Sequence, residues 1–328
     1  MLTSRKRVRA LPLTVVSVLA LAGLTACGDA GGSGSGGSGG SGDKIRVAAS
    51  FYPMAWLAEK VGGTDAAVQT LAKPGAEPHD QELTARQVAD VGRAKLTLYV
   101  KGVQPAVDEA VAKHAKGDKA LDAASVVKTL APPAEDEHAH EHEHGAEGHE
   151  QDHGGAGSDP HIWLDPNRMA TVADALGKRL AVLDPAHAAG YQSRAAAVAK
   201  QLTDLDGQFK TGLGACKQKT IVTAHAAFGY LADRYGLKQV SIAGVDPSSE
   251  PSPKRLGELT HEIREAKATT VFTETLVSPK VAETLAREAG VKTAVLDPVE
   301  GIKEGSSDDY LSVMRKNLDT LRSSLECK

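Results

Sequence analysis

The stretch TIVTAHAAFGYLADRYGLKQVSI, residues 220–242, decides the fold of this 328-residue chain. Its first four residues are apolar or β-branched and predict a buried strand, residues 227–235 have helical spacing, and residues 239–242 predict a second strand. A strand, a helix and a strand in succession form the βαβ unit of a parallel sheet. The C-terminal half continues in the same way, with predicted helices at 253–267 and 279–289, strands at 270–273 and 293–296, and a last helix from about Ser307.

The N-terminal half shows the same alternation. The predicted strands are 45–51 (IRVAASF), 67–72 and 96–100, and the predicted helices run from Pro53 to about Val61 and from 84 to 93. Residues 167–211, between the halves, have helical spacing with one break at Asp184-Pro185, which predicts a long rigid helical connection. We therefore expect an α/β fold of two lobes, each a mainly parallel sheet flanked by helices, with a cleft between them.

The first residues have the pattern of a bacterial lipoprotein signal peptide. Four basic residues precede an apolar run at 11–24, which is shorter than the ~20 residues of a membrane-spanning helix. The sequence LTAC at 24–27 resembles the lipobox, in which the cysteine becomes the lipidated first residue; an ordinary cleaved signal is the alternative. Residues 28–42 are nearly all Gly and Ser and predict a flexible tether. We expect Cys27 to anchor the protein to the cell membrane, facing the extracytoplasmic side.

These patterns predict the domain organisation. The expected parts are a signal peptide (1–26), a tether (27–42), an N-terminal lobe (43–166), a helical connection (167–211) and a C-terminal lobe (212–328).

Charge and cysteine content narrow the possible partners and the compartment. Residues 1–26 hold four basic and no acidic residues, so their removal changes the formal net charge from −4 to −8. A chain of this charge with no basic patch is not expected to bind nucleic acid. Two cysteines remain, Cys216 and Cys327, and an even number in a secreted chain predicts one disulfide, tying the last helix to the start of the second half.

A histidine-rich acidic segment, EDEHAHEHEHGAEGHEQDH, occupies residues 135–153. Alternating imidazoles and carboxylates are ligands for divalent metals such as zinc, and the composition cannot build a packed core. The segment is interpreted as an accessory metal-binding loop, with a solvated spacer as the alternative. Its six histidines are His138, His140, His142, His144, His149 and His153.

Four further candidate metal ligands lie outside this segment. His79, His225 and Asp297 each follow a predicted strand, and His161 lies in SDPHIWLDP. Ligands of open α/β sheets bind at the carboxyl ends of strands, so two facing lobes would bring these groups together in the cleft.

The order of these motifs resembles the metal-binding solute-binding lipoproteins of ABC transporters, in particular the zinc-uptake branch. The resemblance covers residues 45–328. It rests on ASFYPMAWLAEKVGG, PGAEPHDQELTARQVADV, DPHIWLDP, VTAHAAFGYLADRYGL, SSEPSPKRL, VFTETLVSP and LDPVEGI, and on the acidic histidine-rich insert before the second histidine.

The resemblance implies one metal bound between the lobes by three histidines and usually a carboxylate. Carried over, these are His79, His161, His225 and Asp297, with Glu77 and the histidines of the 135–153 segment as competitors for the fourth place. It also implies a monomeric receptor that passes Zn²⁺, as transported ligand, to a membrane permease driven by a cytoplasmic ATPase.

The predicted ligand set separates this interpretation from others. Three imidazoles and one carboxylate suit tetrahedral Zn²⁺ and leave no position for an attacking water, so we expect no enzymatic activity. Three alternatives remain: a manganese or mixed-metal receptor, a secreted zinc hydrolase with Glu274 as its base, and a surface adhesin or metal-storage protein that uses the 135–153 segment.

Overall fold

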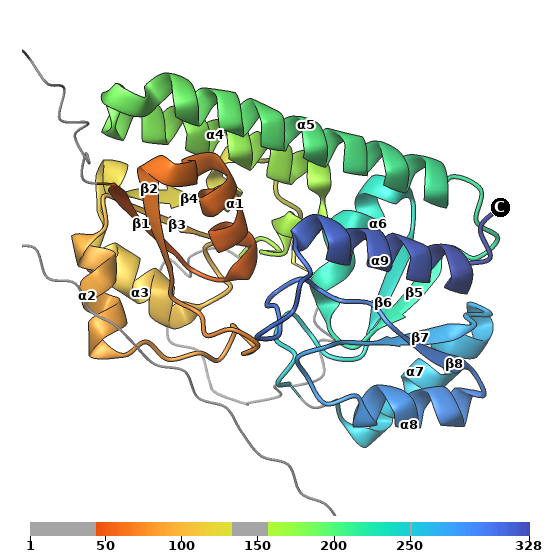
Figure 1. The fold of residues 1–328 in the computed structure, drawn as a ribbon. Helices are drawn as coiled ribbons and strands as arrows, with labels where there is room; N and C mark the ends of the chain where they lie inside the picture. The colour runs from red at the N-terminus through yellow and green to blue at the C-terminus, as the bar shows by residue number, and fades with distance from the viewer. Residues whose placement is uncertain (1–43, 133–156, 250) are drawn as a thin grey trace, which may run out of the picture. The chain divides into compact units, whose positions relative to one another are not determined.

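Two four-stranded parallel sheets form the framework of the computed structural model, which describes residues 44–132, 157–249 and 251–328 (Figure 1). The strands of the first sheet are β1 (Ile45–Ala49), β2 (Ala66–Thr70), β3 (Leu96–Tyr99) and β4 (Ala120–Asp122). Those of the second are β5 (Thr220–Thr223), β6 (Lys238–Ser241), β7 (Thr270–Thr273) and β8 (Lys292–Val295).

Nine α-helices accompany these strands in the part of the chain that the structure describes. They are α1 (Tyr52–Gly62), α2 (Ala85–Arg93), α3 (Pro105–His114), α4 (Pro166–Leu183), α5 (Ala188–Leu213), α6 (Gly229–Tyr235), α7 (Pro253–Glu265), α8 (Lys280–Ala289) and α9 (Tyr310–Ser324).

Both sheets have the same topology. The strand orders are β2-β1-β3-β4 and β6-β5-β7-β8, and every pairing is parallel. The central strands are rich in apolar residues because both of their faces are covered: all four residues of β7 are buried, as are three of the four in β5. In each sheet the strand order reverses between the first and third strands, which creates a crevice at their carboxyl ends where ligands bind in such folds.

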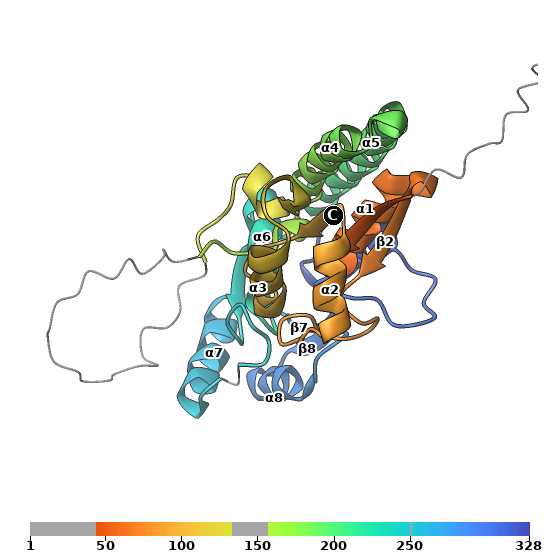
Figure 2. The same ribbon diagram turned by 90° about the vertical axis from the view of Figure 1, so that its left-hand side faces the viewer.

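Helices cover both faces of each sheet. In the N-terminal lobe α1 lies on one face and α2 packs beside α3 on the other (Figures 1 and 2). In the C-terminal lobe α7 and α8 share one face, while α6 and α9 lie on the side toward α5. The predicted α/β fold of two lobes with parallel sheets is confirmed.

The helices α4 and α5 connect the lobes. The first half of α5 is fastened to the N-terminal lobe, because Arg194 donates from Nε to the Val61 carbonyl at 2.8 Å. Its second half packs against α9 and α6 of the C-terminal lobe. The two connecting helices approach closely at Gly177, where a Cβ would lie 2.5 Å from that of Ala195. One apolar cluster runs from β1 and β3 through α4 and α5 to β5 and α9, which makes the connection rigid, as predicted.

Several expectations about local structure are met and others are not. The helical break predicted at Asp184-Pro185 is present, since α4 ends at Leu183 and α5 begins at Ala188. The disulfide between Cys216 and Cys327 is confirmed and joins positions 111 residues apart. Helix α3 and strand β4 were not predicted; β4 has only three residues, too few for a periodic signal.

No helix within residues 44–132, 157–249 and 251–328 combines the length and apolar character that a membrane crossing requires. The predicted signal peptide, Cys27, the tether and the histidine-rich segment 135–153 lie outside the described residues.

A buried carboxylate fixes α6 against α5. Asp206 on α5 accepts hydrogen bonds from Arg234 Nε at 2.5 Å and Nη2 at 2.9 Å, and from the Tyr235 hydroxyl at 3.0 Å. Burial alone would raise the pKa of Asp206, but the bonds from Arg234, Lys210 and Tyr235 outweigh it and lower the pKa to about 2. This group therefore stabilises the fold above its unfolded pKa of about 4, and the contribution disappears as pH falls toward 2.

We predict that Asp206→Asn lowers the free energy of unfolding by about 2 kcal/mol at neutral pH, the value of a pKa depressed by nearly two units. Because the protonated wild-type side chain also loses this contribution, the difference between the two proteins should narrow between pH 4 and pH 2. Urea unfolding at several pH values measures it. Asp204→Asn, on the exposed face of the same helix, is the control; a difference that is constant with pH would contradict the assignment.

Candidate metal centre

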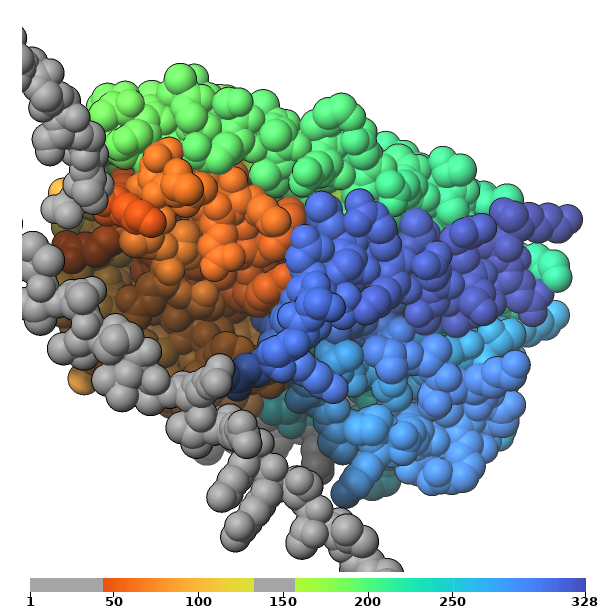
Figure 3. Space-filling model, viewed as in Figure 1, coloured from red at the N-terminus to blue at the C-terminus, as the bar shows by residue number. Residues whose placement is uncertain are grey.

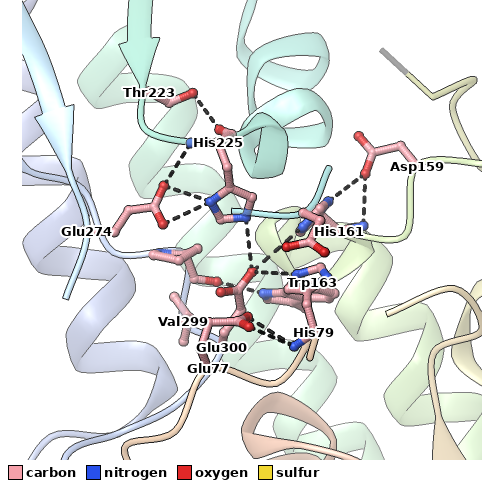
Figure 4. A network of polar contacts seen from close by, with 12 residues as sticks. Glu77, His79, Asp159, His161, Trp163, Thr223, His225, Glu274, Val299 and Glu300 are labelled. Atoms are coloured by element: carbon pink, nitrogen blue, oxygen red, sulfur yellow. Dashed lines mark hydrogen bonds and ion pairs between the residues drawn. The ribbon is translucent and has the colours of Figure 1, made fainter. Parts of the chain in front are cut away.

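Three histidines and one glutamate converge where the lobes meet (Figure 4). His79 lies in the loop after β2, His161 precedes the turn that leads into α4, His225 follows β5, and Glu300 follows β8. Their candidate ligand atoms all lie within 4.8 Å of one another. His79 is 6% exposed, Glu300 1%, and the other two are fully buried. Elements from both lobes therefore build a single enclosed group.

The three imidazoles are directed at one carboxylate oxygen. Glu300 Oε1 lies 3.4 Å from Nε2 of His79, 3.7 Å from that of His161 and 3.3 Å from that of His225. Burial alone would raise the pKa of Glu300, but its contacts with His225 and His79 outweigh burial and hold the pKa far below its usual range. The glutamate is thus an anion that faces all three nitrogens. A cation bound between them could be coordinated by its carboxylate and by the three rings.

Two further carboxylates orient two of the rings. Nδ1 of His161 lies 2.8 Å from Asp159 Oδ1, and Nδ1 of His225 lies 2.8 Å from both oxygens of Glu274. A proton on Nδ1 is therefore donated to the carboxylate, and the lone pair for a metal is on Nε2. Among the described residues, the buried Nε2 atoms of His161 and His225 make no hydrogen bond of good geometry, and Glu300 Oε1 approaches them only at 3.7 Å and 3.3 Å. A metal would satisfy both.

The histidine pKa values follow their surroundings. Burial lowers the pKa of His161 despite the neighbouring Asp159, so this ring is neutral. Burial also acts to lower the pKa of His225, but bonds to Glu274 and Glu300 outweigh it and raise the pKa to about 10. For His79, the bond to Glu300 likewise outweighs burial and raises the pKa. A metal entering at neutral pH therefore replaces protons on the rings nearest Glu300.

The loop that carries His79 is held from two sides. The His79 backbone N–H donates to both oxygens of Glu77, each at 3.0 Å. Across the junction, a Cβ on Gly301 would lie 3.3 Å from the Ala76 carbonyl oxygen, so this loop touches the segment that carries Glu300. In the view of Figure 3, which has the direction of Figure 1, the N-terminal and C-terminal lobes are in contact. Glu77, a predicted competitor for the fourth place, lies outside the group of four and caps the turn.

The structure places Glu300, and not Asp297, in the fourth position, which corrects the sequence prediction. Asp297 Oδ1 accepts from the Val299 N–H at 2.7 Å, and Oδ2 accepts from the Thr275 hydroxyl at 2.8 Å. Its carboxylate is thus occupied by neighbouring groups. The residue that the sequence prediction missed, Glu300, lies in the same motif, LDPVEGI. The available signal was the Asp-Pro pair, because an Asp in a turn commonly bonds its own backbone two residues on, which leaves the following Glu for the metal.

The arrangement is suited to holding a metal. Three imidazole nitrogens and one carboxylate oxygen match the four-coordinate sites of Zn²⁺. Glu274, named above as the base in the hydrolase alternative, has both oxygens at 2.8 Å from Nδ1 of His225.

The family of the chain follows from its comparison with known proteins. The family model described as zinc-uptake complex component A, periplasmic, matches residues 47–324. The chain belongs to this family. The resemblance noted in the sequence is thereby confirmed.

Two curated relatives of this component A family show the extent of the similarity. The chain is 37% identical over 287 residues to the zinc-binding lipoprotein AdcA of Streptococcus pneumoniae (strain ATCC BAA-255 / R6), a match of 85% of this chain and 55% of that one. It is 35% identical over 290 residues to the high-affinity zinc uptake system protein ZnuA of Bacillus subtilis (strain 168), a match of 87% and 89%. The chain thus spans about half the length of the AdcA relative.

A solved component A structure agrees with the fold. The Zn(II)-bound ZnuA-like domain of Streptococcus pneumoniae AdcA matches with a TM-score of 0.70 and 33% identity, covering 86% of this chain and 99% of that one.

We predict that Asp159→Asn and Glu274→Gln each weaken binding of the tightest divalent metal about 10- to 100-fold, because each removes the carboxylate that orients a ring. Competition with a chelator of known affinity measures the change. Asp204→Asn, which removes the same charge from an exposed position on α5, should leave the affinity unchanged. Wild-type affinity in both site variants would show that these carboxylates do not support the ligands.

Proposed function

We propose that this protein is an extracytoplasmic, high-affinity zinc receptor that delivers Zn²⁺ to an ABC permease for import. The observation that carries the proposal is the convergence of three buried Nε2 atoms on one oxygen of Glu300. The proposed ligands are His79, His161, His225 and Glu300. The matched family is named for zinc uptake, and the AdcA and ZnuA relatives are named as zinc proteins.

The ligand set favours zinc over manganese. Imidazole suits Zn²⁺, whereas oxygen-rich ligand sets suit Mn²⁺. A given site also binds Zn²⁺ more tightly than Mn²⁺ according to the Irving–Williams order. A site with three nitrogens and one oxygen therefore discriminates by ligand type as well as by intrinsic affinity.

Binding without catalysis is the second part of the proposal. A catalytic zinc site keeps one position for water and places a base beside it. Here four protein groups can supply the four donor atoms of a closed site, and both oxygens of Glu274 already contact Nδ1 of His225. The zinc is cargo.

The proposal extends to the rest of the chain through its sequence. A signal peptide at 1–26 would be removed, Cys27 would carry the lipid, and residues 28–42 would tether a monomeric body of two lobes above the membrane. The partners would be the permease and its cytoplasmic ATPase. We propose that the segment 135–153 serves as an accessory collector of zinc, since its histidines and carboxylates are metal ligands.

We predict that His79→Ala, His161→Ala and His225→Ala each weaken Zn²⁺ binding by more than the roughly 10- to 100-fold loss typical of the supporting carboxylates, since each removes a ligand itself. Competitive titration of purified protein tests this, and a parallel titration against Mn²⁺ should show a preference for zinc. His114→Ala, at the exposed end of α3, is the matched control. Unchanged affinity in any two of the three variants would refute the site.

Deletion of residues 135–153 should reduce the number of Zn²⁺ ions bound while the tightest site keeps its affinity. The reason is that the four proposed ligands all lie outside the deleted segment. Isothermal titration gives both quantities. Loss of the tightest site on deletion would favour a storage or adhesin role in which this segment is the working part.

A further inference from the structure

The residue before Glu300 has a backbone conformation that its side chain disfavours. Val299 has φ of 59°, in the left-handed region, and is fully buried. The other non-glycine residues with positive φ among those the structure describes are Lys267 and Glu326, which lie two residues after the ends of α7 and α9, where this conformation is common. Val299 follows no helix and is β-branched, and a β-branched residue in this region is a true outlier.

Such a conformation persists only where its surroundings impose it. Asp297 Oδ1 accepts from the Val299 N–H at 2.7 Å and fixes the turn directly. Asp297 is itself held, because Thr275 donates to its Oδ2 at 2.8 Å. Asn317 on α9 completes the support: its Oδ1 accepts from the Asp297 N–H at 2.9 Å, and its Nδ2 donates to the Asp297 carbonyl at 2.6 Å.

A further contact comes from beside His161. Trp163 Nε1 donates to the Pro298 carbonyl at 2.7 Å, so the turn is also bound to the segment that carries another proposed ligand (Figure 4). The turn 297–299 is therefore fastened by α9, by the loop after β7 and by the segment before α4. All of these bonds are made to the three residues that directly precede Glu300.

We propose that Asp297 is a positioning residue that holds Val299 in the left-handed conformation and so directs the Glu300 carboxylate at the three imidazoles. The inference rests on the proposed zinc site. Asp297 acts through its acceptor oxygens and not as a metal ligand or a remote charge. An asparagine can replace it, because an amide oxygen can accept from the Val299 N–H while the amide nitrogen donates to Thr275 Oγ1.

Removal of the acceptor should change the loop in a defined way. In Asp297→Ala the Val299 N–H loses its partner, and the backbone can relax to negative φ, which moves Glu300 away from the histidines. Metal binding must then restore the disfavoured conformation. The apparent affinity is therefore the intrinsic affinity multiplied by the fraction of molecules that still hold this conformation. Glycine adopts positive φ without steric cost, whereas alanine retains the Cβ that causes the penalty.

The experiment compares five variants of the full chain by competitive Zn²⁺ titration and by the visible absorption of bound Co²⁺, which reports coordination geometry. Glu300→Gln and Asp297→Ala should each weaken zinc binding at least tenfold and alter the cobalt spectrum. Asp297→Asn should remain within about threefold of the wild type with an unaltered spectrum. Asp297→Ala combined with Val299→Gly should recover most of the lost affinity. Asp297→Ala combined with Val299→Ala, which removes nearly as much side chain, should not.

The outcomes separate this inference from the site on which it depends. Wild-type affinity in Glu300→Gln would overturn the ligand assignment and the inference with it. Loss in Asp297→Asn equal to that in Glu300→Gln, or equal affinities in the glycine and alanine double variants, would overturn the inference and leave the zinc site standing. Thermal unfolding of the metal-free variants serves as the control, because an affinity loss caused by general destabilisation would follow the loss of stability across all five variants.

Discussion

The contact on which the rest of the structure depends is the meeting of the Glu300 carboxylate with three imidazole nitrogens at 3.3 to 3.7 Å. It unites the lobes, since His79 comes from the N-terminal lobe, His225 and Glu300 come from the C-terminal lobe, and His161 lies just before α4. A buried carboxylate is costly to desolvate unless it is paired. In the metal-free protein the protonated rings of His79 and His225 provide this pairing, and a divalent cation can take the place of their protons.

The groups around this contact are arranged to favour a cation. Asp159 and Glu274 lie behind two of the rings and add negative charge without joining the group of four. Each fixes the ring nitrogen that faces inward, so the ligands are oriented before any metal arrives. Preorganisation of this kind reduces the ordering cost of binding. The rigid pair α4 and α5, packed in one apolar cluster with both sheets, preserves the spacing of the lobes.

Much of the fold could be read from the sequence because its strands and helices alternate with clear apolar patterns. Strands β5 and β7 were predicted to the residue, and the break between α4 and α5 was marked by Asp184-Pro185. The elements α3 and β4 were missed, and β4 is too short to show a period. The disulfide was predictable from two cysteines in a secreted chain, and its bond joins the end of the chain to the segment after α5.

The candidate site was predicted in part because the pattern of strands shows which residues follow their carboxyl ends. His79 and His225 follow strands, and a position at the carboxyl end of a strand indicates a ligand. Asp297 meets the same criterion, yet its oxygens are occupied by the Val299 N–H and the Thr275 hydroxyl. The Asp-Pro pair hints at the bond to Val299, but the sequence does not show the other partners of Asp297, because Thr275 and Asn317 are 22 and 20 residues away.

X-ray absorption at the zinc edge, on protein loaded with one equivalent of Zn²⁺, tests the central claim most directly. The account predicts three imidazole nitrogens and one carboxylate oxygen at about 2.0–2.2 Å, and the loss of one oxygen scatterer in Glu300→Gln. A wild-type spectrum with fewer than three imidazoles, or one that Glu300→Gln leaves unchanged, would contradict it.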